Sequence, residues 1–139
     1  AGADVMARTK TGRTPLHYAA VSNTTASVQI LLTAGADAMA RGGNGWTPLH
    51  WASSGGSYLN IETLLAAGAN VMARGGDDWT PLHWAASSGT SDNIEVLLAA
   101  GADAKAKSKD GKTPWDLAQE NEEAEGTKGY WALNDAQYN

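Results

Sequence analysis

A repeat of 33 residues is the feature of this sequence that most limits how the chain can fold. The dipeptide Thr-Pro recurs at this interval, beginning at Thr14, Thr47, Thr80 and Thr113. The tripeptide Gly-Ala-Asp/Asn recurs at the same interval, beginning at Gly2, Gly35, Gly68 and Gly101. Residues 34–66 and 67–99 are identical at 23 of 33 positions, which chance does not produce. A period of this length indicates a repeat architecture in which each unit stacks on its neighbours.

Each unit carries the sequence signals of two short helices. Thr14 is suited to cap a helix through its hydroxyl, and Pro15 suits the first helical position. Glycine accepts the left-handed conformation usual just past a helix, so Gly35 is predicted to end the second helix. The apolar residues of the two helices stand at helical spacing: Leu16, Ala19 and Ala20, then Val28, Leu31 and Leu32. Helices this short bury too little surface to stand alone, so we predict a solenoid with a continuous core.

We therefore predict one repeat domain over residues 1–139. Its parts are the finger of a preceding unit, three repeats and a C-terminal capping repeat, at residues 1–13, near 14–46, 47–79 and 80–112, and at 113–139. Counting 33 residues on from the last leucine pair predicts that Tyr130 and Trp131 fill the final core slot. The glutamates of residues 120–125 are predicted to face water.

Composition and charge exclude several classes of function. The chain has no cysteine, which excludes disulfides, cysteine nucleophiles and thiolate metal sites. No apolar run near 18 residues and no secretory signal is visible, so we expect a soluble, cytoplasmic protein. The net charge of −5 lies in the cap, because residues 1–112 carry nine basic and nine acidic side chains. A neutral body with an acidic end argues against nucleic-acid binding.

The motif Thr-Pro-Leu-His-x-Ala every 33 residues, with Gly-Ala-Asp between the copies, resembles the ankyrin repeat. The resemblance is clear over about residues 1–118. It implies an all-α fold, a solenoid of stacked helix-turn-helix units with short β-hairpin fingers. Where the family usually has Asn, two residues after Gly-Ala-Asp, this chain has other residues: Met6, Met39, Met72 and Lys105. The finger glycine is replaced in the third copy by Asp78.

Three histidines recur one repeat apart, at His17, His50 and His83. A shared metal ion needs ligands within about 2 Å, whereas neighbouring copies are separated by roughly the 8–10 Å spacing of packed helices. No acidic residue recurs beside each histidine to orient it as a catalytic base. The resemblance implies that this histidine hydrogen-bonds the backbone and ties neighbouring fingers together, so we predict a structural role.

The aromatic residues fall into two groups. Tyr18, Trp51 and Trp84 lie inside the first helix of each unit, and we predict that they pack between repeats. Trp46 and Trp79 each precede Thr-Pro at the end of a finger, where the family turns side chains towards its concave face. Tryptophan is enriched at binding hot spots, but at this position it also braces fingers. Both interpretations stay open from the sequence.

Basic residues form another recurring set: Arg8, Arg41, Arg74 and Lys107. We favour a solvated edge with local ion pairs over a contact surface for an acidic partner. Residues 105–112 (KAKSKDGK) form the one dense basic patch. The glycine-rich stretches at 40–45 and 73–78 lack the Gly-Lys-Ser/Thr of a phosphate loop, so we predict tight finger turns there.

From these patterns we predict a non-enzymatic, monomeric module that binds another protein, and no nucleic acid, membrane, cofactor or metal. The candidate partner-binding residues of the fingers are Arg8, Lys10, Thr11, Arg13, Arg41, Asn44, Trp46, Arg74, Asp77, Trp79, Lys107, Lys109 and Lys112. Those of the first helices are Ser54, Gly55, Ser87 and Ser88. The alternative is an engineered or consensus-like ankyrin scaffold without a natural partner, which the shared methionines and close repeat identity favour. Catalysis is disfavoured because every candidate base is a repeated fold element.

Overall fold

The structure, a computed structural model, describes residues 4–22 and 24–138. Within these ranges it has eight α-helices: α1 (Pro15–Ala20), α2 (Ala26–Thr33), α3 (Pro48–Gly55), α4 (Tyr58–Ala66), α5 (Pro81–Ser88), α6 (Ser91–Ala99), α7 (Pro114–Gln119) and α8 (Lys128–Ala136). A short 3₁₀ helix, η1 (Gly76–Asp78), lies before α5. Gly2, which begins the first Gly-Ala-Asp, lies outside the described residues. The prediction of an all-α repeat solenoid is confirmed.

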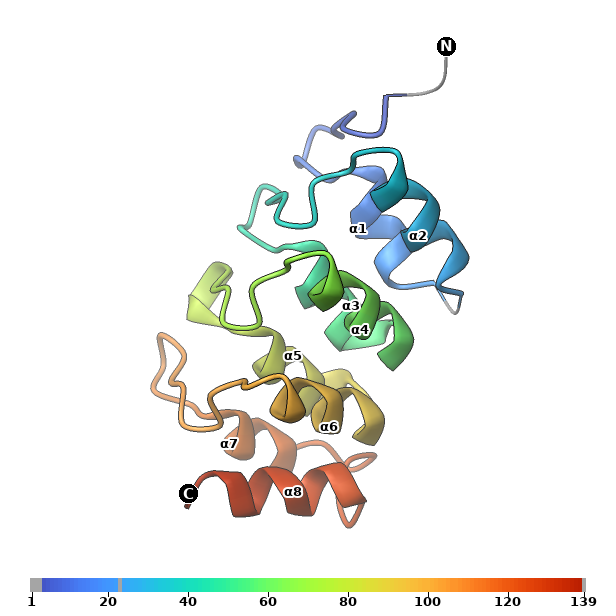
Figure 1. Cartoon of the computed structure of the whole chain (residues 1–139). Coiled ribbons are helices and arrows are strands. Elements are labelled where there is room, and N and C mark those ends of the chain that lie inside the picture. The colour runs from blue at the N-terminus through green and yellow to red at the C-terminus, as the bar shows by residue number, and fades with distance from the viewer. Residues whose placement is uncertain (1–3, 23, 139) are drawn as a thin grey trace.

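The helices stack in two rows (Figure 1). Each of α1, α3, α5 and α7 contacts the next to form the first row, and α2, α4, α6 and α8 form the second. The loops that lead into the first-row helices all project from the same side of the stack. We call them the first to fourth fingers: residues 7–13, 40–46, 73–79 and 106–112. Residues 33 apart in the sequence therefore become spatial neighbours along each row.

The Thr-Pro dipeptide starts the first-row helices by local chemistry. Thr47 is the extended N-cap of α3, its side-chain oxygen accepts the backbone N–H of His50, and Pro48 is the first helical residue. The His50 side chain reaches back to accept the backbone N–H of Thr47 at 3.0 Å. This reciprocal pair satisfies two donors that a helix start leaves free. In the cap, Asp116 replaces the histidine opposite Thr113.

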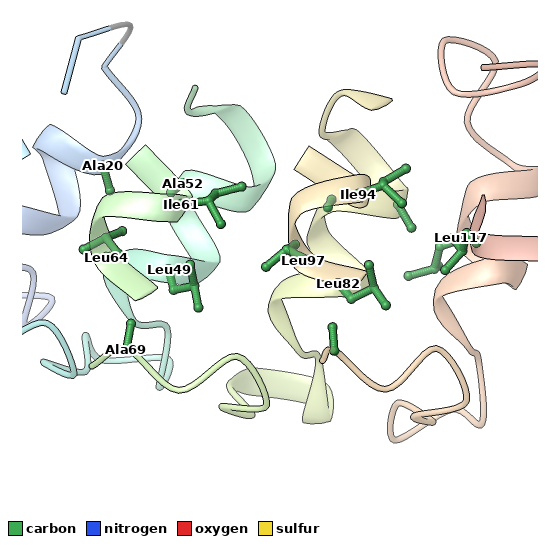
Figure 2. Packing of buried hydrophobic residues seen from close by; sticks show 14 of the residues in the cluster. Ala20, Leu49, Ala52, Ile61, Leu64, Ala69, Leu82, Ile94, Leu97 and Leu117 are labelled. Carbon is green, nitrogen blue, oxygen red and sulfur yellow. The ribbon is translucent and has the colours of Figure 1, made fainter. Parts of the chain in front are cut away.

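Leucine and isoleucine side chains from both rows form one continuous core (Figure 2). The largest of its fully buried aliphatic side chains are Leu16, Leu49, Ile61, Leu64, Leu82, Ile94, Leu97 and Leu133. Ala52 and Ala85 lie between them with no exposed surface. Their small side chains allow neighbouring helices to approach closely enough to exclude water from the core.

The cap closes the core differently from the sequence-based expectation. Tyr130 and Leu133 of α8 are buried, and Tyr130 packs against Trp115 with ring centroids 4.6 Å apart. Trp131 is 54% exposed, so the prediction that it fills the last core slot is wrong. The reason is helical geometry, because consecutive residues lie about 100° apart around a helix and only one of the pair faces inward.

The short β-hairpins predicted for the fingers are not formed in the described part of the chain. Each finger is a tight loop closed by a backbone hydrogen bond, such as Gly42 N–H to Trp46 O at 3.0 Å. Each finger is joined to the next by one backbone hydrogen bond, such as Gly43 N–H to Thr11 O at 2.6 Å. A β-ladder needs a run of paired bonds, so these isolated bonds give ordered fingers without strands.

Each finger turn contains a residue in the left-handed backbone region. Gly12, Gly45 and Gly111 have φ angles of 76°, 77° and 79°. In the third finger Asp77 and Asp78 take φ angles of 59° and 58°. Aspartate tolerates this region better than most side chains, so the turn survives the loss of its glycine and forms η1.

Candidate functional site

The three histidines fasten first-row helices to the fingers that follow them. Nδ1 of His50 accepts the N–H of Thr47, so its proton lies on Nε2, which donates to the carbonyl oxygen of Trp79 at 3.0 Å. The other two histidines repeat this bond at 2.8 and 3.0 Å, from His17 to Trp46 and from His83 to Lys112. The prediction of a structural role is confirmed, and the bonds also fix the backbone that carries Trp46 and Trp79.

Burial keeps these imidazoles neutral. Removal from water lowers the pKa of His50 to about 4, although the backbone carbonyl of Trp79 opposes the shift by accepting a hydrogen bond from Nε2. Burial likewise lowers the pKa of His17 and of His83. A buried imidazole with both ring nitrogens hydrogen-bonded is suited to a structural bond and poorly suited to proton transfer at neutral pH.

The arginines of the fingers form further hydrogen bonds, which join each finger to the next. Nη1 of Arg41 donates to Gly45 O in its own finger at 2.8 Å and to Arg74 O in the next finger at 2.7 Å. Arg8 and Arg74 repeat both bonds at 2.7–2.9 Å. The predicted local ion pairs are not formed at these arginines within the described residues. Backbone carbonyls of the adjacent finger lie closer to the guanidinium groups than any carboxylate does.

The unusual methionines join the segments that lead into neighbouring fingers. The sulfur of Met39 accepts the backbone N–H of Asn70 at 3.1 Å. Met6 and Met72 accept the N–H groups of Asp37 and Asp103 in the same way, at 3.3 and 3.2 Å. Thioether sulfur is a weak acceptor, so each bond is weaker than one to an oxygen. The three methionines therefore share one structural position between successive repeats.

Three adjoining hollows lie between the fingers and the first-row helices. The central hollow has a volume of about 390 Å³ and is lined by Arg13, Val21, Asn44, Trp46, His50, Trp51, Ser54 and Trp84. It shares Trp46 with a hollow of about 150 Å³ on the side of the first finger and with one of about 280 Å³ on the side of the third. We call the three together the tryptophan groove. The two outer hollows add Thr11, Gly42, Gly43, Gly76, Asp77 and Trp79 to its lining.

Trp46 is held between a glycine and two aromatic rings. Its indole lies so close to Gly75 in the third finger that a Cβ atom there would overlap the ring. The ring also meets Trp84 edge-on, with centroids 5.2 Å apart, and His50, with centroids 5.1 Å apart. Trp79 also packs against Trp84, with ring centroids 4.8 Å apart. The finger tryptophans thus pack against the first-row helices through part of each ring. The part of each ring that remains exposed lines the groove.

Arg13 and Trp51 form the other end of the central hollow. The guanidinium carbon of Arg13 lies 4.7 Å from the centre of the Trp51 ring, a cation–π contact. Tyr18 meets the same indole edge-on, with ring centroids 5.7 Å apart. Arg13 occupies the position before Thr-Pro that Trp46 and Trp79 occupy in the next two repeats. One repeat position therefore supplies a cation at one end of the groove and indoles further along.

The groove brings together some of the predicted site residues and leaves others apart. Those that line it are Thr11, Arg13, Asn44, Trp46, Ser54, Asp77 and Trp79. Those outside its lining are Arg8, Lys10, Arg41, Gly55, Arg74, Ser87, Ser88, Lys107, Lys109 and Lys112. Lys112 pairs instead with Glu120 in the cap, at 2.9 Å between Nζ and Oε1, which raises the pKa of the lysine.

Sequence reasoning assigned Trp51 and Trp84 to packing and did not place them in the site. Both are partly exposed and both line the central hollow, as does Val21 at the end of α1. The available signal was their position: they stand five residues after Trp46 and Trp79, on the helices that the fingers lead into. Nε1 of Trp84 is buried and has no hydrogen-bond partner among residues 4–22 and 24–138, so packing holds its ring.

Two structural features are absent from the described residues. No group of three or more His, Cys, Asp or Glu side chains is gathered there as a set of metal ligands. None of the helices described has both the length and the apolar character required to traverse a bilayer.

Comparison with known families agrees with the geometry of the repeats. A model of three copies of the ankyrin repeat matches residues 1–75, and a model of many copies matches residues 64–118. A search of curated proteins gave no match. The two family matches together span the helix pairs from α1 to the start of the cap, and the first covers more than half of the chain. The chain belongs to the ankyrin repeat family.

Proposed function

We propose that this chain is a non-enzymatic module that binds a segment of another protein in the tryptophan groove. Ankyrin repeats are in general protein–protein interaction modules, and proteins built from them are typically scaffolds without catalytic activity. The observation that carries the proposal is the groove itself. Three partly exposed indoles line one hollow of about 390 Å³ on the side of the fingers.

The composition of the groove suits recognition of a protein. Tryptophan side chains bury a large apolar area on binding and lose little conformational freedom, which is why they are common at hot spots. The aromatic packing around Trp84 and the backbone bonds from the histidines hold these side chains in place before binding. A surface that is already ordered loses little entropy on association, so more of the contact energy is retained as affinity.

The surface formed by Arg8, Arg41 and Arg74 is a weaker candidate for partner binding. Nη1 of Arg41 already donates to Gly45 O and Arg74 O, so a partner would have to compete with two existing bonds. The same holds for Arg8 and Arg74. We therefore assign partner binding to the groove and a scaffold role to Arg8, Arg41 and Arg74.

The test is a selection of binding peptides from a random displayed library against the immobilised protein. The same peptides are then measured against Trp51→Ala, which removes one wall of the central hollow, and against Trp131→Ala. Trp131 is the matched control, because it is an exposed tryptophan on α8 that does not line the groove. Thermal melts first establish that both variants fold as the parent does.

We expect the selected peptides to bind the parent and Trp131→Ala alike and to lose about thirtyfold in affinity on Trp51→Ala, the loss typical of a hot-spot residue. Peptides that bind Trp51→Ala as well as the parent would place the binding surface elsewhere. A library that yields no binder would favour the alternative of a scaffold without a partner of its own.

A further inference from the structure

We infer that the tryptophan groove selects an acidic segment, in which one bulky apolar side chain enters the central hollow and an adjacent Asp or Glu pairs with Arg13. This inference rests on the proposed function and names the chemistry of its partner. It is carried by three features of the described residues: the apolar walls of the hollow, the contact of Arg13 with Trp51, and the charges around the groove.

The walls of the central hollow are apolar over most of their area. Trp46, Trp51 and Trp84 supply indole surfaces, and Val21 adds an aliphatic group that is 38% exposed. The volume of about 390 Å³ is at the small end of the range for ligand pockets, which suits one or two large side chains and not a folded domain. Burying such side chains against indoles provides the hydrophobic part of the affinity.

Arg13 is placed to receive a carboxylate. Its guanidinium carbon lies 4.7 Å from the centre of the Trp51 ring, so its side chain contacts an aromatic ring. Within the described residues the hydrogen bonds of Arg13 are made by its backbone, so the N–H donors along the edge of its planar guanidinium are left for a ligand. Such an edge binds a carboxylate through two parallel hydrogen bonds. Neither of the ion pairs in the described ranges involves Arg13.

The charges of the groove are unevenly distributed along it. His50 is neutral at physiological pH because burial lowers its pKa to about 4, which leaves Arg13 as the charged side chain of the central hollow. Lys112 is paired with Glu120 in the cap. Asp77 lines the hollow on the side of the third finger and gives that part of the groove the opposite sign. An acidic group is therefore attracted to one end of the groove and repelled from the other.

The contrast between Arg13 and Arg41 supports this assignment. Both side chains extend from fingers, but Nη1 of Arg41 bonds to two backbone carbonyls. Arg13 makes its contact with an aromatic ring and lines the hollow. A residue whose polar groups are left free beside an apolar hollow sets specificity through charge.

The experiment compares the sequences of displayed peptides selected on the parent, on Arg13→Glu, on Arg13→Gln and on Lys105→Glu. On the parent we expect enrichment of a bulky apolar residue with Asp or Glu within a few positions. On Arg13→Glu we expect the acidic preference to change to Lys or Arg, and on Arg13→Gln to disappear. Lys105→Glu is the matched control, since it makes the same reversal of charge at an exposed residue that does not line the groove, so the acidic preference should persist.

Affinity and salt dependence give a second readout. A synthetic peptide from the parent selection should bind Arg13→Gln about tenfold more weakly. Raising the sodium chloride concentration should weaken its binding to the parent, because salt screens an ion pair at the protein surface. An analogue with Asn or Gln in place of the acidic residue should be largely insensitive to salt.

The possible outcomes separate this inference from the proposed function. If the selected peptides depend on Trp51 but show no acidic preference, or if Arg13→Glu selects the same peptides as the parent, the acidic partner is refuted and the groove remains a binding site. If no selected peptide depends on Trp51, both proposals fail. A change of charge preference on Arg13→Glu, with dependence on Trp51 retained, supports both.

Discussion

Two regions of the molecule are built from residues that recur at the same 33-residue interval. The first is the set of hydrogen bonds by which histidines and arginines hold the fingers, which we call the inter-finger bonds, and the second is the tryptophan groove. They differ in whether the side-chain groups already have partners within the protein. In the first region the ring nitrogens of His50 and Nη1 of Arg41 are occupied by groups of the protein. In the groove, Trp46 and Trp51 remain partly exposed around a hollow. Recurrence alone therefore does not separate structural from binding residues. What separates them is whether the polar groups and aromatic faces of a side chain already have partners within the fold.

The two regions are also connected. The carbonyl oxygens of Trp46 and Trp79 accept the histidine bonds, while the side chains of the same residues line the groove. The backbone of each finger tryptophan is thus held by the scaffold, and its indole is presented to solvent. Changes in the inter-finger bonds should act mainly on stability, and changes in the groove mainly on binding.

Acidification should have the largest effect on the inter-finger region. His50 has a folded-state pKa of about 4, below the value of about 6.5 expected when unfolded, so the unfolded chain binds its proton first. Stability is complete above about pH 6.5 and falls as the pH drops towards 4, by about 3 kcal/mol from this residue. The lowered pKa values of His17 and His83 act in the same direction.

Urea unfolding at pH 7, 5.5 and 4.5 measures this dependence. His50→Gln serves as the control, because it removes the titrating group and should reduce the slope of stability against pH. A free energy of unfolding that stays constant from pH 7 to pH 4.5 would contradict the conclusion that His50 is a buried, neutral imidazole in the folded protein.

Replacement of His50 should be the most damaging of the substitutions considered for the scaffold. His50→Ala leaves the N–H of Thr47 and one bond of the carbonyl of Trp79 unmade in a buried place. We expect a loss of about 2 kcal/mol in the free energy of unfolding at pH 7. The measurement is urea unfolding followed by circular dichroism, and an unchanged midpoint would show that water replaces the imidazole without cost.

The pair Arg41→Ala and Arg13→Ala tests the comparison directly. Arg41→Ala removes two bonds to backbone carbonyls of two fingers and should lower the free energy of unfolding by about 1 kcal/mol, reduced by solvent exposure. Arg13→Ala should change stability by less than about 0.5 kcal/mol, because its one aromatic contact is exposed in part. Thermal melts of the two variants side by side decide the matter. The reverse order of stabilities would break the distinction between the two arginines.

The methionine contacts should give the smallest effect. Met39→Leu keeps the volume of the side chain and removes the sulfur that accepts the N–H of Asn70. Since thioether sulfur is a weak acceptor and the site is partly exposed, we expect a loss of about 0.5 kcal/mol. Met39→Asn offers an oxygen at the position where the family usually has asparagine. If the Asn variant is the less stable of the two, the sulfur is not a substitute for that oxygen.

Much of the fold and part of the candidate site could be predicted from the sequence. The helix starts at Thr14, Thr47, Thr80 and Thr113 and the left-handed glycines depend on neighbouring residues alone, so a linear pattern reveals them. Trp46 and Trp79 were recognised as candidates because their place before Thr-Pro fixes them at the ends of fingers. Trp131 was misplaced, because counting by repeats does not give the angle at which a helix of a divergent cap docks.

The site was harder to predict wherever a side chain reaches into another repeat. The bonds of Arg41 and His50 cross 33 and 29 residues of sequence, and Trp46 meets Trp84 across 38. Whether such atoms meet depends on how one unit is rotated and spaced against the next. No single repeat carries that information in its own pattern.

By itself the sequence determined the period, the helix caps, the apolar faces and hence the stacked solenoid, because these follow from local backbone preferences and from the need to bury apolar surface. Only the tertiary structure decided which recurring residues have their polar groups bonded within the scaffold and which keep exposed surface beside the groove. The physical reason is that satisfaction of a donor or an aromatic face depends on atoms from neighbouring repeats. Stacking brings Gly75 under Trp46 and Arg13 over Trp51, and it brings the carbonyl of Arg74 to Arg41.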